Sequence, residues 1–459
     1  MKKVYVINTP SEERMTIEGR CAQKESTWSS VMPPYSLASV SAIFRRGGFD
    51  VKSIDCRVED IDKETLLELL SAEGVDIVVI NSSIPTFEFD VEFVRDLREK
   101  CKNLLIIVFG IMPPQGERAF LEAGGSSVIK GEPEFGAEEI AKTIINGGEV
   151  EKTYSGMTKD LDGLPHPAWD LFDLSKYTIL GEGFKRARYL FVVPARGCPF
   201  NCSFCNAFVY YGKEVRYRTV KSVVDEIEDD INEFGIVNFA MWTETFTFNR
   251  KYVSDLCDEI IKRKLKIDWI SNSRVDRVDK ELLEKMKEAG CWMVSFGVES
   301  GSQEILNKAH KGTAIEDSIT AIRTANEVGL ITVAHTIIGL VGETEKTSWE
   351  TLKILNDAKV DFAQFYCAVP MPETELYKEA VKNNWIKAGA KWSEFEQTVS
   401  IMDLPGFDHE RVMKVRKRIY LRYYLNPCRL LRIIRKSGMG SLIPIAREGI
   451  NFVGSILKR

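Results

Sequence analysis

The first 150 residues alternate short apolar segments with amphipathic ones, and this alternation limits the folds open to the chain. The apolar segments are nearly continuous in Val, Ile, Leu and Phe, which is typical of strands buried on both faces of a parallel sheet. The segments between them have helical periodicity. The sequence therefore predicts an α/β fold that begins with a doubly wound, Rossmann-like domain over residues 1–150. Its expected strands are 4–8, 51–55, 75–80, 104–109 and 127–130.

A second series of strand and helix segments occupies residues 186–395. The six units predict an open, partial (β/α)6 barrel, whose chemistry is expected at the carboxyl ends of its strands. Residues 151–185 contain many turn formers and predict a linker. Residues 396–459 predict a small, basic helical region. The expected barrel strands lie near 189–194, 236–242, 267–271, 292–296, 331–338 and 362–369.

Three cysteines follow the first strand of the second series. Cys198, Cys202 and Cys205 have C-x3-C-x2-C spacing, and the next cysteine, Cys257, lies in a helical segment. A 4Fe-4S cluster normally takes four thiolates, so a loop with three leaves one iron open to another ligand. A zinc knuckle is the alternative, and it would need a fourth Cys or His. The histidines of the chain are His166, His310, His335 and His409.

The cysteine loop resembles the signature of radical S-adenosylmethionine (SAM) enzymes. The resemblance implies that SAM chelates the open iron and is split into a 5′-deoxyadenosyl radical. It also implies that Phe204 lies beside the adenine, although an aromatic residue here could equally be core packing. Four strand-end positions match segments that contact SAM in this family. These are Glu244 for the methionine amino group, Arg274 for its carboxylate, Glu299 for the ribose and Gly339 for the adenine side.

The first domain is similar to the cobalamin-binding domain that precedes the barrel in many of these enzymes. Residues 33–38, 44–51, 110–113 and 130–135 carry this resemblance. Ligands of such sheets bind at the carboxyl ends of the strands. The D-x-H-x-x-G motif that supplies a cobalt ligand is absent, and residues 1–150 contain no His. The expected cobalamin contacts are Asn8, Ser82, Ser83, Gly110, Gly131 and Glu132.

Two other interpretations of the first domain stay open. One is a Rossmann-like domain that binds a nucleotide or has lost its ligand, although no G-x-G-x-x-G follows the first strand. The other is a methylthiotransferase, whose second cluster would use Cys21, Cys56 and Cys101. That class ends in a small β-barrel, whereas this chain ends in helical segments.

Over nearly its whole length the chain resembles cobalamin-dependent (class B) radical SAM enzymes. The resemblance implies a methyltransferase acting on an unactivated carbon through the 5′-deoxyadenosyl radical and methylcobalamin. It also implies a 4Fe-4S cluster, SAM and cobalamin as cofactors, and an electron donor such as flavodoxin or ferredoxin. Enzymes with this layout that cyclise, contract rings or oxidise lipid or tetrapyrrole-like substrates are an alternative. A non-catalytic cobalamin or cluster sensor is another, but it would not need the SAM residues.

Composition and charge bear on location and partners. Ten cysteines and no cationic-apolar leader predict a reducing, cytoplasmic setting. No apolar run approaches the roughly 18 residues that a membrane span needs. From Arg411 onward the chain has thirteen Lys or Arg and one acid, Glu448. These basic amphipathic segments predict either a helical cap on the barrel or peripheral contact with an anionic membrane. Nucleic acid is disfavoured because no aromatic stacking platform accompanies the charge.

Overall fold

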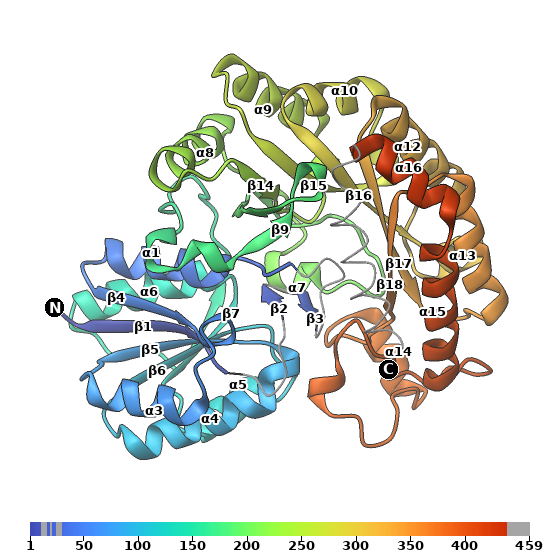
Figure 1. Ribbon diagram of the computed structural model, residues 1–459. Helices are drawn as coiled ribbons and strands as arrows, with labels where there is room; N and C mark the ends of the chain where they lie inside the picture. Colours follow the sequence, from blue (N-terminus) through green and yellow to red (C-terminus); the bar gives the residue numbers. More distant parts are fainter. Residues whose placement is uncertain (11–15, 19–20, 24–29, 438–459) are drawn as a thin grey trace.

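The computed structural model describes residues 1–10, 16–18, 21–23 and 30–437 (Figure 1). The first domain contains a six-stranded sheet in which all strands run parallel. This confirms the predicted doubly wound sheet. β1 lies between β4 and β5, so the strand order reverses direction beside β1. In spatial order the strands are β4 (Asp50–Asp55), β1 (Lys3–Asn8), β5 (Ile77–Ser82), β6 (Leu105–Gly110), β7 (Ser127–Gly131) and β8 (Thr153–Gly156).

Helices cover both faces of this sheet, as the continuous apolar strands require. All six residues of β5 are buried, since they meet helices on either side. One face packs against α1 (Tyr35–Arg46) and α6 (Pro133–Ile145). The other packs against α3 (Lys63–Ala72), α4 (Phe87–Lys100) and α5 (Gly116–Glu122). A single helical turn, α2 (Cys56–Glu59), follows β4.

The segment predicted as a linker begins with a strand. β8 pairs with β7 along the edge of the first sheet, and Tyr154 is its one buried side chain. Such a short edge strand carries no continuous apolar signal, so the sequence did not predict it. The rest of the segment includes β9 (Thr178–Leu180), which pairs antiparallel with β10 (Arg186–Arg188) just beyond the predicted end of the linker. The domain limits at 150, 185 and 395 stay predictions.

The second domain is the predicted open barrel. Its six strands are all parallel and follow one another in chain order, each pairing with the strand before it. They are β11 (Leu190–Val192), β14 (Asn238–Met241), β15 (Asp268–Arg274), β16 (Cys291–Glu299), β17 (Ile331–Ile338) and β18 (Phe362–Cys367). The covering helices are α8 (Val220–Phe234), α9 (Arg250–Lys262), α10 (Lys280–Glu288), α12 (Ile315–Val328) and α13 (Glu345–Asp357). Shorter helices are α11 (Gln303–Lys308) and α14 (Glu375–Lys382).

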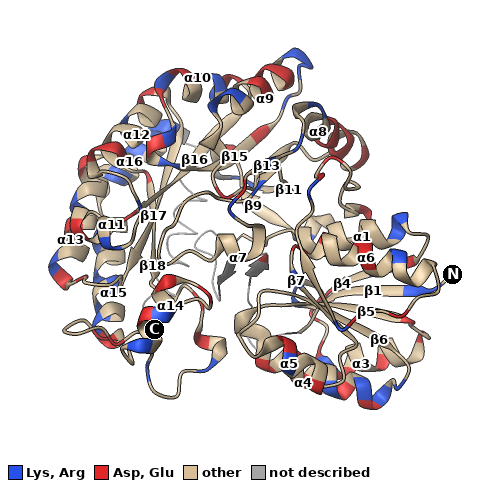
Figure 2. Cartoon of the chain, turned by 180° about the vertical axis from the view of Figure 1, so that it is seen from behind, with Lys and Arg blue, Asp and Glu red and all other residues tan. Residues whose placement is uncertain are grey.

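Local sequence signals explain the limits of these helices. The hydroxyl of Thr219 accepts a hydrogen bond from the Ser222 amide at the start of α8, and Gly235 ends the helix in the left-handed conformation. Val223, Val224 and Ile227 of α8 are buried, whereas its opposite face is acidic (Figure 2). In the same view most charged residues lie on helices, and the strands of both sheets are nearly uncharged.

The C-terminal helices close the open side of the barrel. α15 (His409–Tyr424) packs along β18 and is followed by α16 (Pro427–Ser437) (Figure 1). β18 is an edge strand, and side chains of α15 bond its backbone. The Tyr420 hydroxyl lies 2.9 Å from the Phe365 amide, and Arg416 Nε donates to the Phe365 carbonyl at 2.6 Å. This arrangement is the cap predicted as one alternative for the basic region. Residues 438–459 of that region lie outside the described residues.

Several basic residues of this region pair with the barrel. Asp361 is buried just before β18, and it accepts from Arg432 at 3.2 Å and from Lys436 at 2.6 Å. Arg429 is buried over the ring of Tyr423. Part of the positive charge therefore has a structural role. Within the described part of the chain, no helix is long and apolar enough to cross a membrane.

Candidate active site

The cysteine loop leaves the carboxyl end of β11 and is closed at its base by a short hairpin. β12 (Ala195–Arg196) pairs antiparallel with β13 (Arg216–Tyr217) on either side of the loop. Between them Gly197 has a φ of +97°, and a Cβ there would lie 1.9 Å from the Glu214 carbonyl oxygen. Only glycine fits this position. After the cysteines, α7 (Ala207–Tyr211) lies between the two domains and contacts β7 (Figure 1).

The backbone of the loop is anchored to the barrel. The Ser203 amide donates to the Ala309 carbonyl at 3.0 Å, and the Leu376 amide donates to the Ser203 carbonyl at 2.9 Å. All three cysteines are half-buried. The loop is therefore fixed above the carboxyl ends of the strands, where barrel chemistry is expected.

Two cations lie within electrostatic range of Cys202. Burial raises the pKa of the Cys202 thiol, while the charges of Lys311 and Arg274 act in the opposite direction. The Arg274 guanidinium lies 3.7 Å from the centre of the Phe200 ring, inside the cysteine loop. Its Nη2 also donates to the Lys311 carbonyl at 3.0 Å. The predicted residue Arg274 is thus beside the cysteines, and Lys311 joins it without having been predicted.

Glu299 ends β16 in a strained conformation. Its φ is +62°, and the register between β16 and β17 shifts there. A non-glycine residue in this region is uncommon and often marks a functional site. Its buried carboxylate accepts from Lys311 Nζ at 2.7 Å. The structure therefore brings together Glu299, Lys311, Arg274 and the cysteine loop.

The remaining predicted SAM contacts occupy the same edge of the barrel. Glu244 follows β14 and is half-buried, within electrostatic range of Tyr211 in α7. Phe204 is half-buried and packs in an apolar cluster with Ile337 at the end of β17. This contact is compatible with both of its predicted roles.

Gly339 directly follows β17 and has a φ of +91°. Its amide donates to the Glu343 carboxylate at 2.5 Å, and the Ser348 hydroxyl donates to the same carboxylate at 3.1 Å. Burial raises the pKa of Glu343 to about 7. Glu343 thus closes the loop on which Gly339 lies.

The donor set of the cysteine loop fits an iron-sulfur cluster. Cys198, Cys202 and Cys205 come from one loop at the carboxyl edge of the barrel, and all three are half-buried. Three thiolates are one fewer than a 4Fe-4S cluster normally takes, so one iron of a cluster held by this loop would be open to another ligand.

The carboxyl edge of the first sheet carries a buried polar network around β1. Asn8 Nδ2 donates to Asp55 at 3.2 Å, and Asn81 Nδ2 donates to Asn8 at 2.9 Å. These residues end the neighbouring strands β1, β4 and β5. The Tyr177 hydroxyl also donates to Asp55, at 3.1 Å. The predicted residue Asn8 thus lies at the switch in strand order, where such sheets bind ligands.

A second buried carboxylate organises the neighbouring residues. Asp90, in the first turn of α4, accepts hydrogen bonds from the hydroxyls of Ser82 and Thr86 at 2.6 Å and also from Thr9. The Ser83 hydroxyl lies 3.0 Å from that of Thr86. Ser82 and Ser83 are therefore held at the predicted edge.

The two predicted glycines of the first domain have packing roles. A Cβ on Gly110 would lie 1.9 Å from the Ser82 carbonyl oxygen, and one on Gly131 would lie 2.7 Å from that of Gly156. Both glycines also have positive φ angles. Close approach of neighbouring strands therefore accounts for them without a ligand.

Glu132 lies at the interface between the domains. Its carboxylate is fully buried and accepts from the Thr158 amide at 3.0 Å and from Arg196 at 3.2 Å, as well as from Arg216. Both arginines come from the hairpin at the base of the cysteine loop. Glu132 therefore joins the two domains, and its contact with cobalamin stays a prediction. Its pattern in the sequence gave no sign of partners 64 and 84 residues away.

The first-domain edge also fits a polar, anionic cofactor. Arg57 follows β4, and its buried Nε and Nη2 atoms have no hydrogen-bond partner among the described residues. Buried donors of this kind are rare, because an unpaired polar group costs free energy. The polar network and these donors are compatible with the amide-rich, phosphate-bearing cobalamin.

Two of the cysteines considered for a second cluster, Cys56 and Cys101, lie far apart. Cys56 directly follows the carboxyl end of β4, whereas Cys101 caps the end of α4 that leads to the amino end of β6. The two thiols therefore lie at opposite edges of the sheet. The side chain of Cys21 is outside the described residues.

Two family models match the chain. A model described as the B12 binding domain matches residues 26–141, and one described as the radical SAM superfamily matches residues 192–355. The two matches follow each other in the order predicted for the two domains.

Curated proteins of the same layout are similar over most of the chain. An uncharacterized methyltransferase of Pyrococcus horikoshii is 30% identical over 88% of this chain and 90% of its own length. An anaerobic magnesium-protoporphyrin IX monomethyl ester cyclase of Cereibacter sphaeroides is 31% identical over 76% of this chain, which spans only 60% of that enzyme. Among solved structures, the radical SAM methyltransferase TsrM of Kitasatospora setae, with cobalamin and a [4Fe-4S] cluster bound, superposes with a TM-score of 0.65. It is 17% identical, and the match covers 83% of this chain and 75% of that one, so it supports the fold.

Proposed function

Because this chain belongs to the radical SAM superfamily and has a B12 binding domain ahead of its barrel, we propose that it methylates an unactivated carbon of a small-molecule or lipid substrate. When bound, the cluster and SAM supply a 5′-deoxyadenosyl radical, and cobalamin supplies the methyl group. Such cofactors carry the difficult step, and the protein contributes binding, orientation and exclusion of water.

The observation that carries the proposal is the contact between the cysteine loop and the segment after β7 of the B12 binding domain. The loop after β7 of the B12 binding domain contributes Glu132 and Glu134, and both carboxylates are buried against Arg196. Arg196 stands two residues before Cys198. A methyl group held by one domain can therefore meet a substrate radical formed in the other.

Side chains around the cysteine loop support SAM binding. Arg274 and Lys311 are buried cations that we assign to the methionine carboxylate. The Arg274 guanidinium matches a carboxylate in geometry and charge, and the Lys311 ammonium adds a second positive charge. Glu244 and Glu299 are assigned to the amino group and the ribose. Phe204 and the backbone at Gly339 are assigned to the adenine. These buried or half-buried groups would hold SAM in a site with little water.

Product analysis tests the proposal. The reconstituted enzyme, supplied with cobalamin, is incubated anaerobically with SAM and a reductant, and the products are measured by mass spectrometry. We expect both 5′-deoxyadenosine and S-adenosylhomocysteine, the second because SAM remethylates cobalamin. The Cys198→Ala variant should form no 5′-deoxyadenosine. The absence of 5′-deoxyadenosine from the wild-type reaction would contradict radical chemistry.

A non-methylating reaction is the second candidate. It is supported by the similarity to the cyclase, which acts on a tetrapyrrole ester by its printed name. The same assay separates the two candidates. Formation of 5′-deoxyadenosine with no S-adenosylhomocysteine at any substrate tested would favour cyclisation or oxidation over methyl transfer.

The reaction also needs an electron for the cluster, and we propose flavodoxin or ferredoxin as its donor. The test replaces the chemical reductant with reduced flavodoxin or ferredoxin. We expect 5′-deoxyadenosine with at least one of them. If neither supports turnover while the chemical reductant does, the donor is of another class.

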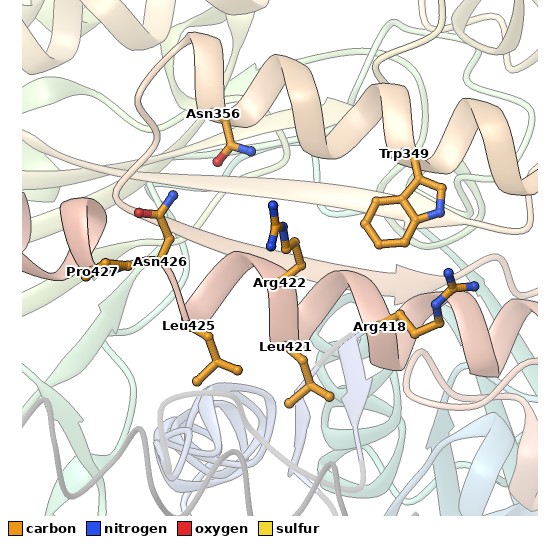
Figure 3. A pocket seen from close by; sticks show the side chains of 8 residues that line it. All are labelled: Trp349, Asn356, Arg418, Leu421, Arg422, Leu425, Asn426 and Pro427. Atoms are coloured by element: carbon orange, nitrogen blue, oxygen red, sulfur yellow. The ribbon is translucent and has the colours of Figure 1, made fainter.

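We propose that the C-terminal helices contact an anionic membrane surface. Leu425, Leu430 and Leu431 are 69%, 44% and 56% exposed, an unusual density of exposed leucine. Beside them α13 and α15 form a groove of about 590 Å3. In Figure 3 Leu421 and Leu425 point away from α13, whereas Arg422 points toward it. Exposed leucines next to cations are typical of helices that lie on anionic lipid. This location would give access to a lipid substrate.

Sedimentation with lipid vesicles tests this contact. We expect binding to phosphatidylglycerol vesicles and none to phosphatidylcholine vesicles. Replacement of Leu425, Leu430 and Leu431 by Ser should abolish binding. The matched control replaces Ile145 and Val381, which are 58% and 51% exposed elsewhere, by Ser. Equal binding of both variants, or no binding by the wild type, would contradict the proposal.

A further inference from the structure

Arg57 is a half-buried residue with two unpaired guanidinium donors at the carboxyl edge of the first sheet. It lies in α2, directly after β4, and its Nε and Nη2 atoms are buried with no hydrogen-bond partner among the described residues. Guanidinium groups are almost never buried in this way, because their donors must be satisfied. No group in the described part of the chain uses these donors.

Two carboxylates lie near Arg57, and neither accepts a hydrogen bond from its two buried guanidinium donors. The backbone amide of Arg57 does donate to Asp55. Asp55 and Asp90 both interact with the charge of Arg57. Asp55 accepts from the side chains of Asn8 and Tyr177, and Asp90 accepts from three hydroxyls. Burial raises the pKa of each carboxyl, which shifts it toward the neutral form and weakens its repulsion of an anion.

These contacts place Arg57 over the end of β1. Asp90 is hydrogen-bonded to Thr9, which follows β1, and to Ser82, which ends β5. Arg57 comes from the opposite neighbour, β4, and is within electrostatic range of Asp90. Its side chain therefore lies at the switch in strand order, and this is the place where doubly wound sheets bind their ligands.

We infer that Arg57 binds the phosphodiester in the nucleotide tail of cobalamin. The corrin side chains are neutral amides, and the phosphodiester is the one anionic group that the cofactor offers to a side chain. A guanidinium presents paired donors that match phosphate oxygens. The inference rests on the binding of cobalamin by this domain. It goes further by naming Arg57 as the side chain that recognises the nucleotide tail.

Three corrinoids test the inference by visible-absorption titration of the full-length protein. Cobalamin has the complete tail, cobinamide phosphate has the phosphate without the base, and cobinamide has neither. We expect Arg57→Gln to weaken the binding of cobalamin and of cobinamide phosphate by about 10- to 100-fold, the range of a charged hydrogen bond. The affinity for cobinamide should stay within about twofold of that of the wild type. Arg57→Lys keeps the charge but loses the paired donors, so its affinity for the two phosphate-bearing corrinoids should lie between those of the wild type and Arg57→Gln. Arg95→Gln, on an exposed site of α4, is the matched control.

Each outcome has a distinct meaning. Equal weakening for all three corrinoids would make Arg57 a structural residue and overturn the inference, as would no weakening for any of them. The inference is supported if the wild type binds all three corrinoids and Arg57→Gln loses affinity for cobalamin and cobinamide phosphate but not for cobinamide. If the wild type binds no corrinoid, the cofactor assignment of the whole domain fails together with the inference. Thermal unfolding of each variant checks that the domain remains folded.

Discussion

Arg196 donates hydrogen bonds to both carboxylate oxygens of Glu134, at 2.7 and 2.9 Å, and joins the cysteine loop to the B12 binding domain. Both side chains are buried. Burial is the largest single effect and tends to raise the pKa of Glu134, but the charge of Arg196 and the hydrogen bonds that Glu134 accepts together outweigh it, so the pKa is lowered. The pair is therefore ionised and depends on both partners.

Replacing Glu134 should destabilise the protein strongly. Glu134→Ala leaves Arg196 buried without its main partner, which costs about 3–5 kcal/mol. Glu138→Ala is the control on the same helix, since Glu138 pairs with Arg46 in a partly exposed position, and exposed pairs contribute about 0–1 kcal/mol. Urea titration followed by circular dichroism measures the free energy of unfolding of both variants. Similar midpoints for the two variants would show that the buried pair is not needed for stability.

Loss of one loop cysteine should abolish the cluster. After anaerobic reconstitution the wild type should hold about four irons per chain, and Cys202→Ala should lose most of them and the visible absorption of the cluster. Cys428 is exposed on α16, far from the loop in sequence, so Cys428→Ala should keep the wild-type iron content. Full iron content in Cys202→Ala would mean that another residue supplies the ligand.

Arg274 should matter for SAM affinity more than its neighbour does. Arg274 and Arg277 both lie near the Phe200 ring, at 3.7 and 5.6 Å, but only Arg274 is buried. We expect Arg274→Gln to raise the dissociation constant for SAM by about tenfold or more and Arg277→Gln to change it little. Equilibrium binding to the reconstituted protein measures the difference. Comparable effects of the two substitutions would remove Arg274 from the site.

Glu343 should make stability depend on pH. Its pKa is raised by burial from 4.5 to about 7, so the folded chain holds this proton more tightly than the unfolded chain does. The stabilisation is present below about pH 4.5 and is lost as the pH rises through about 7. Glu343→Gln should remove this loss, and exposed Glu345→Gln should retain it. Urea titrations between pH 5 and 8 compare the slopes. If the free energy of unfolding of Glu343→Gln fell with pH as steeply as that of the wild type, another group would be responsible for the effect.

Sequence patterns predicted the elements whose signal is local. The strands of both domains are continuous apolar segments, so β5 and β17 were found close to their observed limits. The edge strand β8 was missed because the sheet buries only Tyr154 from it. Hydrophobic periodicity appears where several side chains on one face are buried. An edge strand with one buried side chain therefore shows almost no periodicity.

The structure brings together predicted site residues whose position is set by spacing, whereas partners that are distant in sequence could not be predicted. The three cysteines and the strand-end residues Arg274 and Glu299 could be located because barrel strands deliver their ends to one place. Lys311 lies in a polar loop, and its contact with Glu299 across a bulge has no local signature. Glu132 was predicted as a cobalamin contact from its strand-end position, and its arginine partners could not be predicted because they lie far away in the sequence.

The hydroxyls that α15 places against β18 have a consequence for how the chain must be made. An open barrel of six strands has edge strands, and an exposed edge strand can pair with strands of other chains. Until residues 409–424 have left the ribosome, a nascent chain would present this border to its neighbours. Shortened versions that stop before Asp408 should therefore precipitate or form fibrils during expression, even though they contain all three cysteines.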